Sequence, residues 1–451
     1  METMKEIDSR RDFLKKVAIG SSAIIVGGIL PGFSAESYKR IIGANEKIRA
    51  SVMGVNSRGK VLAQNFALQK ECDVMHICDV DSRAIEKCIS NVQKVQGIKP
   101  QGFGDFRKSL ESKDIDLMVV ATPDHWHAPA AILACKAGKH VYLEKPASHN
   151  PHEGELIVTA AQKYNRLIQM GNQRRSYPNV ITAIRKLHDG IIGRPYFAKG
   201  WYANNRPSIG NGKEVPVPDW LNYELWQGPA PRHPYKDNLI HYNWHWFWNW
   251  GTGEALNNGT HMIDIMRWGL NVEYPERVTS AGGRYRYQDD WETPDTQVIT
   301  LEFPDNTCME WEGRSCNGRT IEGSSAAVIF YGETGSMVID GNAYKIYNLK
   351  DQLIEEVKND FVIDTLNQVN PSQGLDSLHI QNLLDGMRKG KNLNADILGG
   401  YQSTLLCQLG NIALRSGDTL HVDPENGHII GNNKAMRYWS REYEPGWKLT
   451  I

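Results

Sequence analysis

The order of apolar and polar residues predicts two differently built domains. In the first part of the chain, mainly apolar runs that we interpret as buried strands cover residues 48–55, 74–79, 115–121 and 140–143. Helix-like stretches at 60–69 and 129–137 lie between them. Strands and helices that alternate at these lengths are typical of a parallel, doubly wound α/β sheet. We therefore predict such a sheet for residues 46–170.

After residue 193 the pattern changes to consecutive strands separated by tight turns. The expected strands cover residues 195–202, 277–287, 296–303, 307–314, 326–331 and 336–339. This pattern predicts an α+β domain over residues 171–420 with a large, mostly antiparallel open sheet. One face of the sheet should be apolar and available to the partner domain or to another subunit, so we expect a homo-oligomer, a dimer or a tetramer.

Two helices and a tail complete the second part of the chain. Helical patterns at 376–389 and 399–416 are expected to pack back towards the first domain. Residues 421–451 form a C-terminal tail that we predict to be mostly loop.

Composition narrows the class of protein. The chain has 451 residues, a net charge of −1 and 41% hydrophobic residues, which is enough for two or three domains. Because no long basic run occurs beyond the first sixteen residues, we expect no nucleic-acid or anionic-membrane partner. The seven cysteines form no CxxC pair, so we predict buried free thiols, with a Cys308–Cys316 bridge as the alternative.

The N-terminus has the features of an export signal. Arg10 and Arg11 precede an apolar stretch at 17–30, which resembles a twin-arginine signal. The stretch is short for a membrane span, so we interpret residues 1–45 as a leader or anchor followed by a linker. A basic amphipathic helix is the alternative. A working signal would make the protein periplasmic or otherwise exported, already folded, with no stable membrane span in the mature form.

The first expected strand leads into a glycine turn. Gly54, Asn56 and Gly59 follow the pattern GxNxxG, where the dinucleotide fingerprint of Rossmann domains has GxGxxG. Asp79 ends the next strand, twenty residues after Gly59, where an acid that binds the ribose is expected. Asp79 favours NAD over NADP, and Arg83 leaves NADP open as the less favoured cofactor. The alternative role for Asp79 is the N-cap of a helix that begins at residue 82.

Two further segments follow the carboxyl ends of parallel strands, at 122–127 and 144–146. Ligands of such sheets lie at those ends, so we expect the two segments to meet on one rim. Lys145 stands before Pro146, which keeps its backbone extended. The alternative is a lysine paired with Glu144 or another acid on a solvated rim.

These motifs resemble a known family. The segments ATPDHWHAPA at 121–130, AGKHVYLEKP at 137–146 and GNQRRS at 171–176 are similar to the Gfo/Idh/MocA family of sugar oxidoreductases, and the resemblance extends from about residue 46 to the C-terminus. It implies that Lys145 lies beside the nicotinamide and the substrate hydroxyl. The residues that we expect to bind the cofactor are Gly54, Asn56, Ser57, Arg58, Gly59, Asp79, Thr122, Pro123, His127, Glu144, Lys145 and Gln173.

The second domain carries a candidate base. Many relatives have D-x-x-x-H where this chain has Asn257 and His261. An asparagine cannot accept a proton, so we assign proton transfer to His261, Lys145 or both, and only the orientation of a hydroxyl to Asn257. Asp264 is the nearest acid in sequence that could bias the imidazole of His261.

An aromatic run at 241–250 suggests a wall for a sugar, although most of its tryptophans are equally consistent with core packing. Further candidates for substrate contacts are His241, His245, Tyr202, Gln173 and Arg174. The histidine pairs at 125–127 and 241–245 lack a third ligand, so we expect no metal site.

Together these features predict an NAD(H)-dependent oxidoreductase that oxidises a secondary hydroxyl of a sugar or glycoside. Free NAD is scarce outside the cytoplasm, so an exported enzyme would keep and recycle its cofactor. The alternatives are a redox-assisted NAD-dependent glycosidase, as some relatives with this signal and fold are, and a non-catalytic protein that binds NAD and a sugar.

Overall fold

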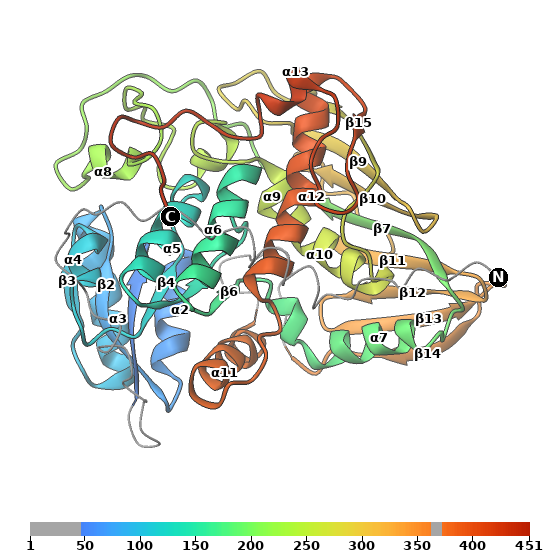
Figure 1. Ribbon diagram of the computed structural model, residues 1–451, viewed down its shortest axis with the longest axis horizontal. Coiled ribbons are helices and arrows are strands. Elements are labelled where there is room, and N and C mark those ends of the chain that lie inside the picture. Colours follow the sequence, from blue (N-terminus) through green and yellow to red (C-terminus); the bar gives the residue numbers. More distant parts are fainter. Residues whose placement is uncertain (1–46, 362–371) are drawn as a thin grey trace, which may run out of the picture. The chain divides into compact units, whose positions relative to one another are not determined.

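The computed structural model describes residues 47–361 and 372–451 (Figure 1). The export signal that we predict for residues 1–45 lies outside the described residues. Both expected sheets are present, so the predicted fold class, a Rossmann-like α/β sheet followed by a mostly antiparallel sheet, is confirmed.

The first sheet has six parallel strands within the described residues, in the order β3-β2-β1-β4-β5-β6. These strands are β1 (Ile48–Met53), β2 (Cys72–Cys78), β3 (Gln101–Phe103), β4 (Leu117–Val120), β5 (His140–Leu143) and β6 (Ile168–Met170). Strands β1 and β4 are neighbours, with Met53 opposite Val120. The strand order reverses between these two strands, and ligands of doubly wound sheets lie outside the carboxyl ends at this point.

Helices connect the parallel strands. They are α2 (Arg58–Ala67), α3 (Ser82–Gln96), α4 (Phe106–Leu110), α5 (His127–Lys136) and α6 (Pro151–Lys163). The side chain of Asp81 caps helix α3 by accepting a hydrogen bond from the backbone N–H of Arg83. The alternative that Asp79 caps this helix is therefore wrong.

The second sheet has nine strands within the described residues, in the order β14-β13-β12-β11-β7-β10-β9-β8-β15. These strands are β7 (Pro195–Ala203), β8 (Arg277–Gly283), β9 (Thr296–Phe303), β10 (Thr307–Arg314), β11 (Ala326–Gly332), β12 (Gly335–Asp340), β13 (Ala343–Asn348), β14 (Leu353–Val357) and β15 (Leu420–His421). Neighbouring strands are antiparallel except β7 and β10, which are parallel.

The remaining described helices are α7 (Pro178–His188), α8 (Tyr223–Gln227), α9 (Glu254–Asn257), α10 (Gly259–Leu270), α11 (Gln373–Lys389), α12 (Ile397–Ser416) and α13 (Asn433–Met436). Short 3-10 turns lie at Asp124–Trp126, Gln173–Ser176 and Asn243–Trp246. Residues 421–451 are mostly loop, as the sequence predicted.

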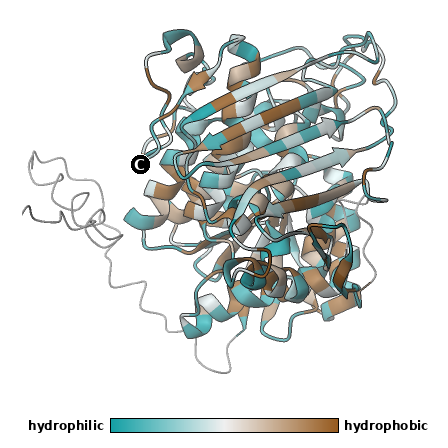
Figure 2. Ribbon diagram, turned by 90° about the vertical axis from the view of Figure 1, so that its right-hand side faces the viewer, coloured by the Kyte–Doolittle hydropathy of each residue, from teal (hydrophilic) through white to brown (hydrophobic). Residues whose placement is uncertain are grey.

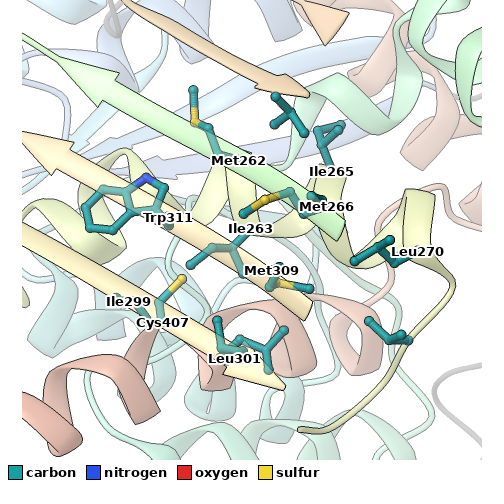
Figure 3. Close-up of a cluster of buried hydrophobic side chains, with 14 of the residues drawn as sticks. Met262, Ile263, Ile265, Met266, Leu270, Ile299, Leu301, Met309, Trp311 and Cys407 are labelled. Carbon is teal, nitrogen blue, oxygen red and sulfur yellow. The ribbon is translucent and has the colours of Figure 1, made fainter. Parts of the chain in front are cut away.

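One face of the second sheet is covered by helices of the same chain. Strands β9 and β10 alternate between buried and partly exposed residues, and the buried side chains of Ile299 and Trp311 join a core with α10 and α12. Figure 3 shows Met262 and Met266 of α10 and Cys407 of α12 in this cluster. The period-2 pattern that predicted the strands therefore also selected the face on which the helices lie.

The opposite face of this sheet carries charged side chains. The ammonium group of Lys199 lies 2.8 Å from the carboxylate of Glu310 and 3.3 Å from that of Glu312. Figure 2 views the strands from this side, where no helix lies in front of them.

The last long helices join the two parts of the chain. Helix α11 packs on α2, and its Ile380, Leu383 and Leu384 belong to the core of the first sheet. Helix α12 packs on α6 and on α10. The expected return of these helices to the first domain is confirmed.

All seven cysteines are free thiols, so the alternative of a Cys308–Cys316 bridge is wrong. Among the helices of residues 47–361 and 372–451, none has the length and apolar content needed to cross a membrane.

Candidate functional site

A cavity lies at the carboxyl ends of β1, β4 and β5, where the strand order reverses. Part of its wall comes from the second half, where Trp226 of α8 and the segment with Tyr242 and Trp244 line it. The predicted cofactor residues that line it are Gly54, Asn56, Ser57, Arg58, Asp79, Thr122, Pro123, His127, Glu144 and Lys145, together with the predicted substrate residues His241, His245 and Asn257. The structure therefore brings segments from both halves to one site.

The glycine turn allows backbone segments to approach each other closely. Gly54 has a φ of +82°, and a Cβ on it would lie 2.6 Å from the carbonyl oxygen of Ala121. Its N–H donates to the carbonyl of Cys78 at 2.9 Å. Asn56 is exposed, and its φ is not positive, so the tolerance of asparagine for unusual backbone angles is not used here. Gly59 does not line the cavity, and it serves the turn by its packing against Gly54.

Asp79 stands where an acid that binds the ribose is expected. Its two carboxylate oxygens accept the backbone N–H groups of Val55, at 2.6 Å, and Asp81, at 3.0 Å. Burial raises the pKa of Asp79, and these two N–H groups oppose the shift. Arg83 is held away from it by a bidentate pair with Asp81 and by stacking 3.4 Å from the ring centre of Trp220.

Lys145 follows β5 and points at α9 in the second half of the chain. Its Nζ donates to the backbone carbonyl of Asn257 at 2.6 Å and to the side-chain Oδ1 of Asn257 at 3.2 Å. Burial lowers the pKa of Lys145, while the negative charges of Glu144, Asp124 and Glu254 raise it. No ion pair joins Lys145 to Glu144 in the described residues, so the alternative of a solvated rim pair is not what the structure shows.

Asn257 is held by a buried acid that sequence reasoning missed. Glu254 accepts a hydrogen bond from the Nδ2 of Asn257 at 3.2 Å and pairs with Arg206 at 2.9 Å. Ser315 donates to the same carboxylate at 2.9 Å. Glu254 and Asn257 are three residues apart on one short helix, and that spacing is the signal by which the sequence could have identified the pair.

Glu144 takes part in a second buried network. The guanidinium of Arg58 joins the carboxylate of Glu144, at 2.8 Å, to that of Asp376 on α11, at 2.6 Å. The side chain of Gln173 does not line the cavity; its amide nitrogen donates to the carbonyl of Gly171 at 2.7 Å, and its amide oxygen accepts from Arg58 at 2.6 Å. Glu144 and Arg58 therefore attach α11 to the rim of the first sheet.

His261 lies close to this site without lining the cavity. Its side chain is 7% exposed, and its Nδ1 is buried without a hydrogen-bond partner in the described residues. Burial and the cations of Lys145, Arg174 and Arg58 lower the pKa of His261 well below its usual value. The imidazole is thus neutral at neutral pH and able to accept a proton.

The expected partner of His261 is engaged elsewhere. Asp264 pairs with the Nε and Nη2 of Arg175 at 2.8–3.0 Å and accepts a hydrogen bond from Ser403 at 2.7 Å. Its carboxylate makes no hydrogen bond to His261 within the described residues. The spacing of three residues between His261 and Asp264 suggested a contact between them. It could not reveal that Arg175, from a different segment, binds Asp264 instead.

Arg174 does not line the cavity. Its guanidinium is partly buried, and burial lowers its pKa. In the described residues it makes no hydrogen bond, ion pair or ring contact. Because its charge also acts on His261, the two side chains share one neighbourhood.

The other substrate candidates have different positions. Tyr202 is fully buried and does not line the cavity; its hydroxyl accepts hydrogen bonds from Asn204 at 2.8 Å and from Arg206 at 3.2 Å. His245 lines the cavity and stacks on Trp244 at 3.6 Å. His241 lies 3.0 Å from Asp81, which places it at the ribose end of the cavity and not beside Lys145.

The tryptophans of the aromatic run are largely core residues. Trp244, Trp246 and Trp250 are 9%, 1% and 5% exposed and belong to buried clusters. Within the described residues, no group of three or more His, Cys, Asp and Glu side chains is arranged to hold a metal ion.

Two further polar residues, Asp124 and Thr122, line the cavity, and they differ in whether their side chains have a hydrogen-bond partner. Asp124 lines the cavity at 3% exposure, burial raises its pKa, and the hydroxyl of Thr252 donates to it. The hydroxyl of Thr122 is buried without a partner in the described residues. The glycine turn and the acid after β2 are features of a dinucleotide site, and the hydroxyl of Thr122 offers a further hydrogen bond to a polar ligand.

Models of a known family match most of the chain. The description "Oxidoreductase family, NAD-binding Rossmann fold" matches residues 48–172, and "Oxidoreductase family, C-terminal alpha/beta domain" matches residues 208–449. The chain belongs to the Gfo/Idh/MocA family. This confirms the family that the sequence motifs indicated, and the first of the two models describes an NAD-binding Rossmann fold.

Curated relatives match part of the chain. A glycosyl hydrolase family 109 protein of Saccharopolyspora erythraea is 30% identical over 212 residues, which are 44% of this chain and 46% of that protein. An alpha-N-acetylgalactosaminidase of Shewanella oneidensis is 24% identical over 199 residues, which are 41% and 43% of the two chains. The match spans less than half the length of these relatives.

Solved structures resemble the fold over a longer range. Levoglucosan dehydrogenase in complex with NADH and levoglucosan has a TM-score of 0.64 and 16% identity, covering 83% of this chain and 99% of that one. Aldose-aldose oxidoreductase from Caulobacter crescentus, complexed with glycerol, has a TM-score of 0.63 and 17% identity, covering 84% and 100%. At these identities the likeness shows the fold.

Proposed function

We propose that this member of the Gfo/Idh/MocA family is an NAD(H)-dependent oxidoreductase that converts a secondary hydroxyl of a sugar or glycoside to a ketone. The observation that carries the proposal is the position of Lys145: its ammonium group projects from the rim that also holds the Gly54 turn and Asp79, and Asn257 holds it from the opposite side. Sugar dehydrogenases among the structural neighbours support the substrate class.

In this proposal each residue of the site has a separate role in the oxidation. A bound nicotinamide supplies the acceptor for the hydride that leaves the carbinol carbon. The neutral imidazole of His261 accepts the hydroxyl proton, and the ammonium of Lys145 stabilises the alkoxide that forms. Asn257 orients Lys145 and takes no proton. Arg174, which has no partner of its own in the described residues, donates to an oxygen of the sugar.

We further propose NAD, and not NADP, as the cofactor. The carboxylate of Asp79 would repel a phosphate on the ribose, while two hydroxyls could donate to it. Arg83 offers little compensation, because its guanidinium is paired with Asp81 and stacked on Trp220.

We also propose that the protein is exported with its cofactor bound. Arg10 and Arg11 with the apolar stretch at 17–30 support passage of the folded protein through the twin-arginine route to the periplasm. A cofactor carried in this way would remain bound and be regenerated within the site. The uncovered face of the second sheet supports a homo-oligomer (Figure 2).

A redox-assisted glycosidase is the second candidate function, and the relatives named glycosyl hydrolase family 109 and alpha-N-acetylgalactosaminidase favour it. Oxidation of the glycoside acidifies the C–H next to the new ketone. Once His261 has passed the hydroxyl proton to solvent, its imidazole could remove the C–H proton, and the aglycone would leave with its bonding electrons and take up a proton. Addition of water to the double bond, and return of the hydride with a proton, would then restore the hydroxyl. The third hypothesis is a non-catalytic protein that binds NAD and a sugar. It is suggested by Asn257, which stands where an acid is expected.

One experiment separates these functions. The purified folded protein is tested for co-purified NAD, and the redox state of that NAD is followed against a panel of glycosides with chromogenic aglycones. The dehydrogenase predicts reduced cofactor and a keto sugar, and the glycosidase predicts released aglycone with no net reduction. Lys145→Ala and His261→Ala should abolish either signal, whereas Lys163→Ala, at an exposed lysine of α6, should not. A sugar-dependent change in nicotinamide absorbance that persists in both variants, with no keto sugar and no released aglycone, would identify the non-catalytic protein.

A further inference from the structure

A second cavity lies beyond the wall of the first, and its charge is unlike that of the protein as a whole. It is lined by segments around His149, Trp248, Gln408 and Tyr438, and by three arginines: Arg415, Arg437 and Arg441. No Asp or Glu occurs in this lining, which we call the arginine cavity. In a chain of net charge −1, this concentrates positive charge at one place on the surface.

Two of these guanidinium groups have no acidic partner. Arg415 lies between the rings of Trp248 and Tyr438, 4.3 Å and 4.2 Å from their centres, and Arg437 has neither ring contact nor ion pair; in the described residues neither side chain has a carboxylate within salt-bridge distance. The negative charge of Glu292 acts on Arg415, but Glu292 accepts the backbone N–H of Trp248 at 2.8 Å and does not line the cavity. The two rings hold Arg415 in place while its N–H donors stay open to a ligand.

Arg441 differs from the other two arginines because Glu153 compensates its charge at 2.7 Å. Its Nη2 donates to the carbonyl of His125 at 2.7 Å, and its Nη1 is buried without a partner in the described residues. It therefore contributes one open donor without adding net charge.

Two residues that line the cavity also have a buried hydrogen-bond acceptor without a donor in the described residues. Gln408 is 3% exposed, and its Nε2 donates to the carbonyl of Ser148 at 3.0 Å, so the amide orientation is set and its Oε1 is the atom without a partner in the described residues. The Nε2 of His149 faces the carbonyl of Trp248 at 3.1 Å, and its buried Nδ1 is likewise unpartnered. Because burial lowers the pKa of His149, that Nδ1 is a lone-pair acceptor.

Open guanidinium donors and unpaired acceptors call for a ligand that has both an oxyanion and hydroxyl groups. We propose that the arginine cavity binds an acidic sugar, with its carboxylate, sulfate or phosphate on Arg415 and Arg437 and its hydroxyls donating to Gln408 and His149. Guanidinium groups suit oxyanions because their N–H groups form a fork that can meet two oxygens of one anion, and hydroxyls would satisfy the two buried acceptors. Such a ligand is either a free acidic monosaccharide or an acidic unit of a longer saccharide.

The arginine cavity shares a wall with the first cavity. Thr252 lines it, and the hydroxyl of Thr252 donates to Asp124 in the first cavity. Leu256 also lines it and directly precedes Asn257, the residue that holds Lys145. A saccharide long enough to pass this segment could thus contact both sites.

Binding to the full-length protein tests the proposal by calorimetry and does not depend on any turnover. The probes are glucuronate, galacturonate, glucose 6-sulfate, neutral glucose and inorganic sulfate. We expect at least one acidic sugar to bind at least about tenfold more tightly than glucose and than sulfate, a difference of about 1.4 kcal/mol. We also expect its affinity to fall as salt is added. No saturable binding of any acidic sugar, or equal binding of inorganic sulfate, would overturn the proposal.

Variants locate the site. Arg415→Ala combined with Arg437→Ala should weaken the acidic sugar at least about tenfold, because two charge-assisted hydrogen bonds are lost. Lys434→Ala, an exposed cation on the same tail, is the matched control and should leave it unchanged. Gln408→Met should weaken the acidic sugar but not sulfate. Unchanged affinity in the double arginine variant places the ligand elsewhere and contradicts the proposal.

Comparison of a monosaccharide with a disaccharide shows whether the ligand is a free acidic sugar or a unit of a longer saccharide. A disaccharide that carries the preferred acidic unit binds more tightly than the monosaccharide if the cavity is a subsite for a longer saccharide, and Lys145→Met then weakens only the disaccharide. Equal affinities for both identify a separate monosaccharide site. Because both outcomes are measured as binding, absence of oxidoreductase activity would not affect them.

Discussion

The ammonium group of Lys145 lies 2.6 Å from the backbone carbonyl oxygen and 3.2 Å from the side-chain oxygen of Asn257, two residues that are 112 positions apart in the chain. The contact joins the end of strand β5 to helix α9. It fixes the position of a cation whose charged form is disfavoured by burial. In the proposed function Asn257 is therefore a positioning residue for Lys145.

Removing the side-chain half of this contact should slow turnover. Asn257→Ala keeps the carbonyl contact and loses the side-chain oxygen, so kcat should fall about tenfold, the value of one hydrogen bond to a charged group. The amount of bound NAD should not change, because Asn257 holds Lys145 and not the dinucleotide-binding turn. Comparison of kcat with cofactor stoichiometry checks this, and loss of cofactor together with activity would contradict the assigned role.

Alanine substitutions at two glycines, Gly54 in the glycine turn and Gly97 after helix α3, should have different outcomes. Gly54→Ala places a Cβ 2.6 Å from the carbonyl oxygen of Ala121, so NAD affinity should fall at least about tenfold. Gly97→Ala has a similar φ of +77° but no atom within 4 Å of the new Cβ. It should cost about 1–2 kcal/mol of stability from backbone strain and leave NAD affinity unchanged. Fluorescence titration and thermal unfolding of both variants separate the two effects.

Asp79 predicts the cofactor preference. Asp79→Ser removes the carboxylate, so the ratio of NADP to NAD affinity should rise at least about tenfold. Arg83→Ala should leave this ratio unchanged, because Arg83 is paired with Asp81. Direct titration of both nucleotides is the measurement. A wild-type protein that prefers NADP would show that the proposed preference is wrong.

Adjacent arginines should behave differently. Arg174→Ala removes a guanidinium with no partner in the described residues, so it should raise KM for the sugar about tenfold without lowering the melting temperature. Arg175→Ala leaves Asp264, 1% exposed, without its counter-ion and should destabilise the fold by about 3–5 kcal/mol. Steady-state kinetics and chemical unfolding of the two variants provide the comparison. Equal effects of both would refute the assignment of Arg174 to the substrate.

The buried histidines predict loss of stability in acid. Burial lowers the pKa of His379 from its usual value of 6.5 to about 4. Because the folded-state pKa is the lower one, its stabilising contribution is complete above pH 6.5 and is lost as pH falls from there towards 4. Between pH 7 and pH 5 this residue should account for about 2 kcal/mol.

His379→Gln provides the control for this effect. The histidine is fully buried and its two nitrogens contact Ser176 at 2.7 Å and the carbonyl of Met170 at 2.9 Å, contacts that a glutamine can partly replace without titrating. Urea unfolding at pH 7 and pH 5 should show a smaller pH dependence in the variant. An identical dependence in both proteins would exclude His379 as a source.

The pattern of apolar and polar residues predicted those elements whose relative positions follow from the general geometry of parallel sheets. Strand β1, the turn at Gly54, Asp79 after β2, and Lys145 after β5 could be placed together because the carboxyl ends of parallel strands share one edge of the sheet. The strands β9 and β10 were predicted with their observed bounds, because their side chains alternate between a covered and an uncovered face. Strands β13 and β14 were missed at the far edge of the sheet, where β14 has no buried residue to mark its pattern.

The two sheets, the glycine turn and the cation at its rim could therefore be predicted from the sequence, since each depends on neighbours in sequence or on the regular geometry of strands. The partners of the charged side chains became known only from the folded chain: Arg58 with Asp376, Asp264 with Arg175, and Glu254 with Arg206. It alone also assembled the arginine cavity from four distant segments. The physical reason is that periodicity reveals which face of an element is buried, whereas the identity of the group that covers that face depends on long-range packing.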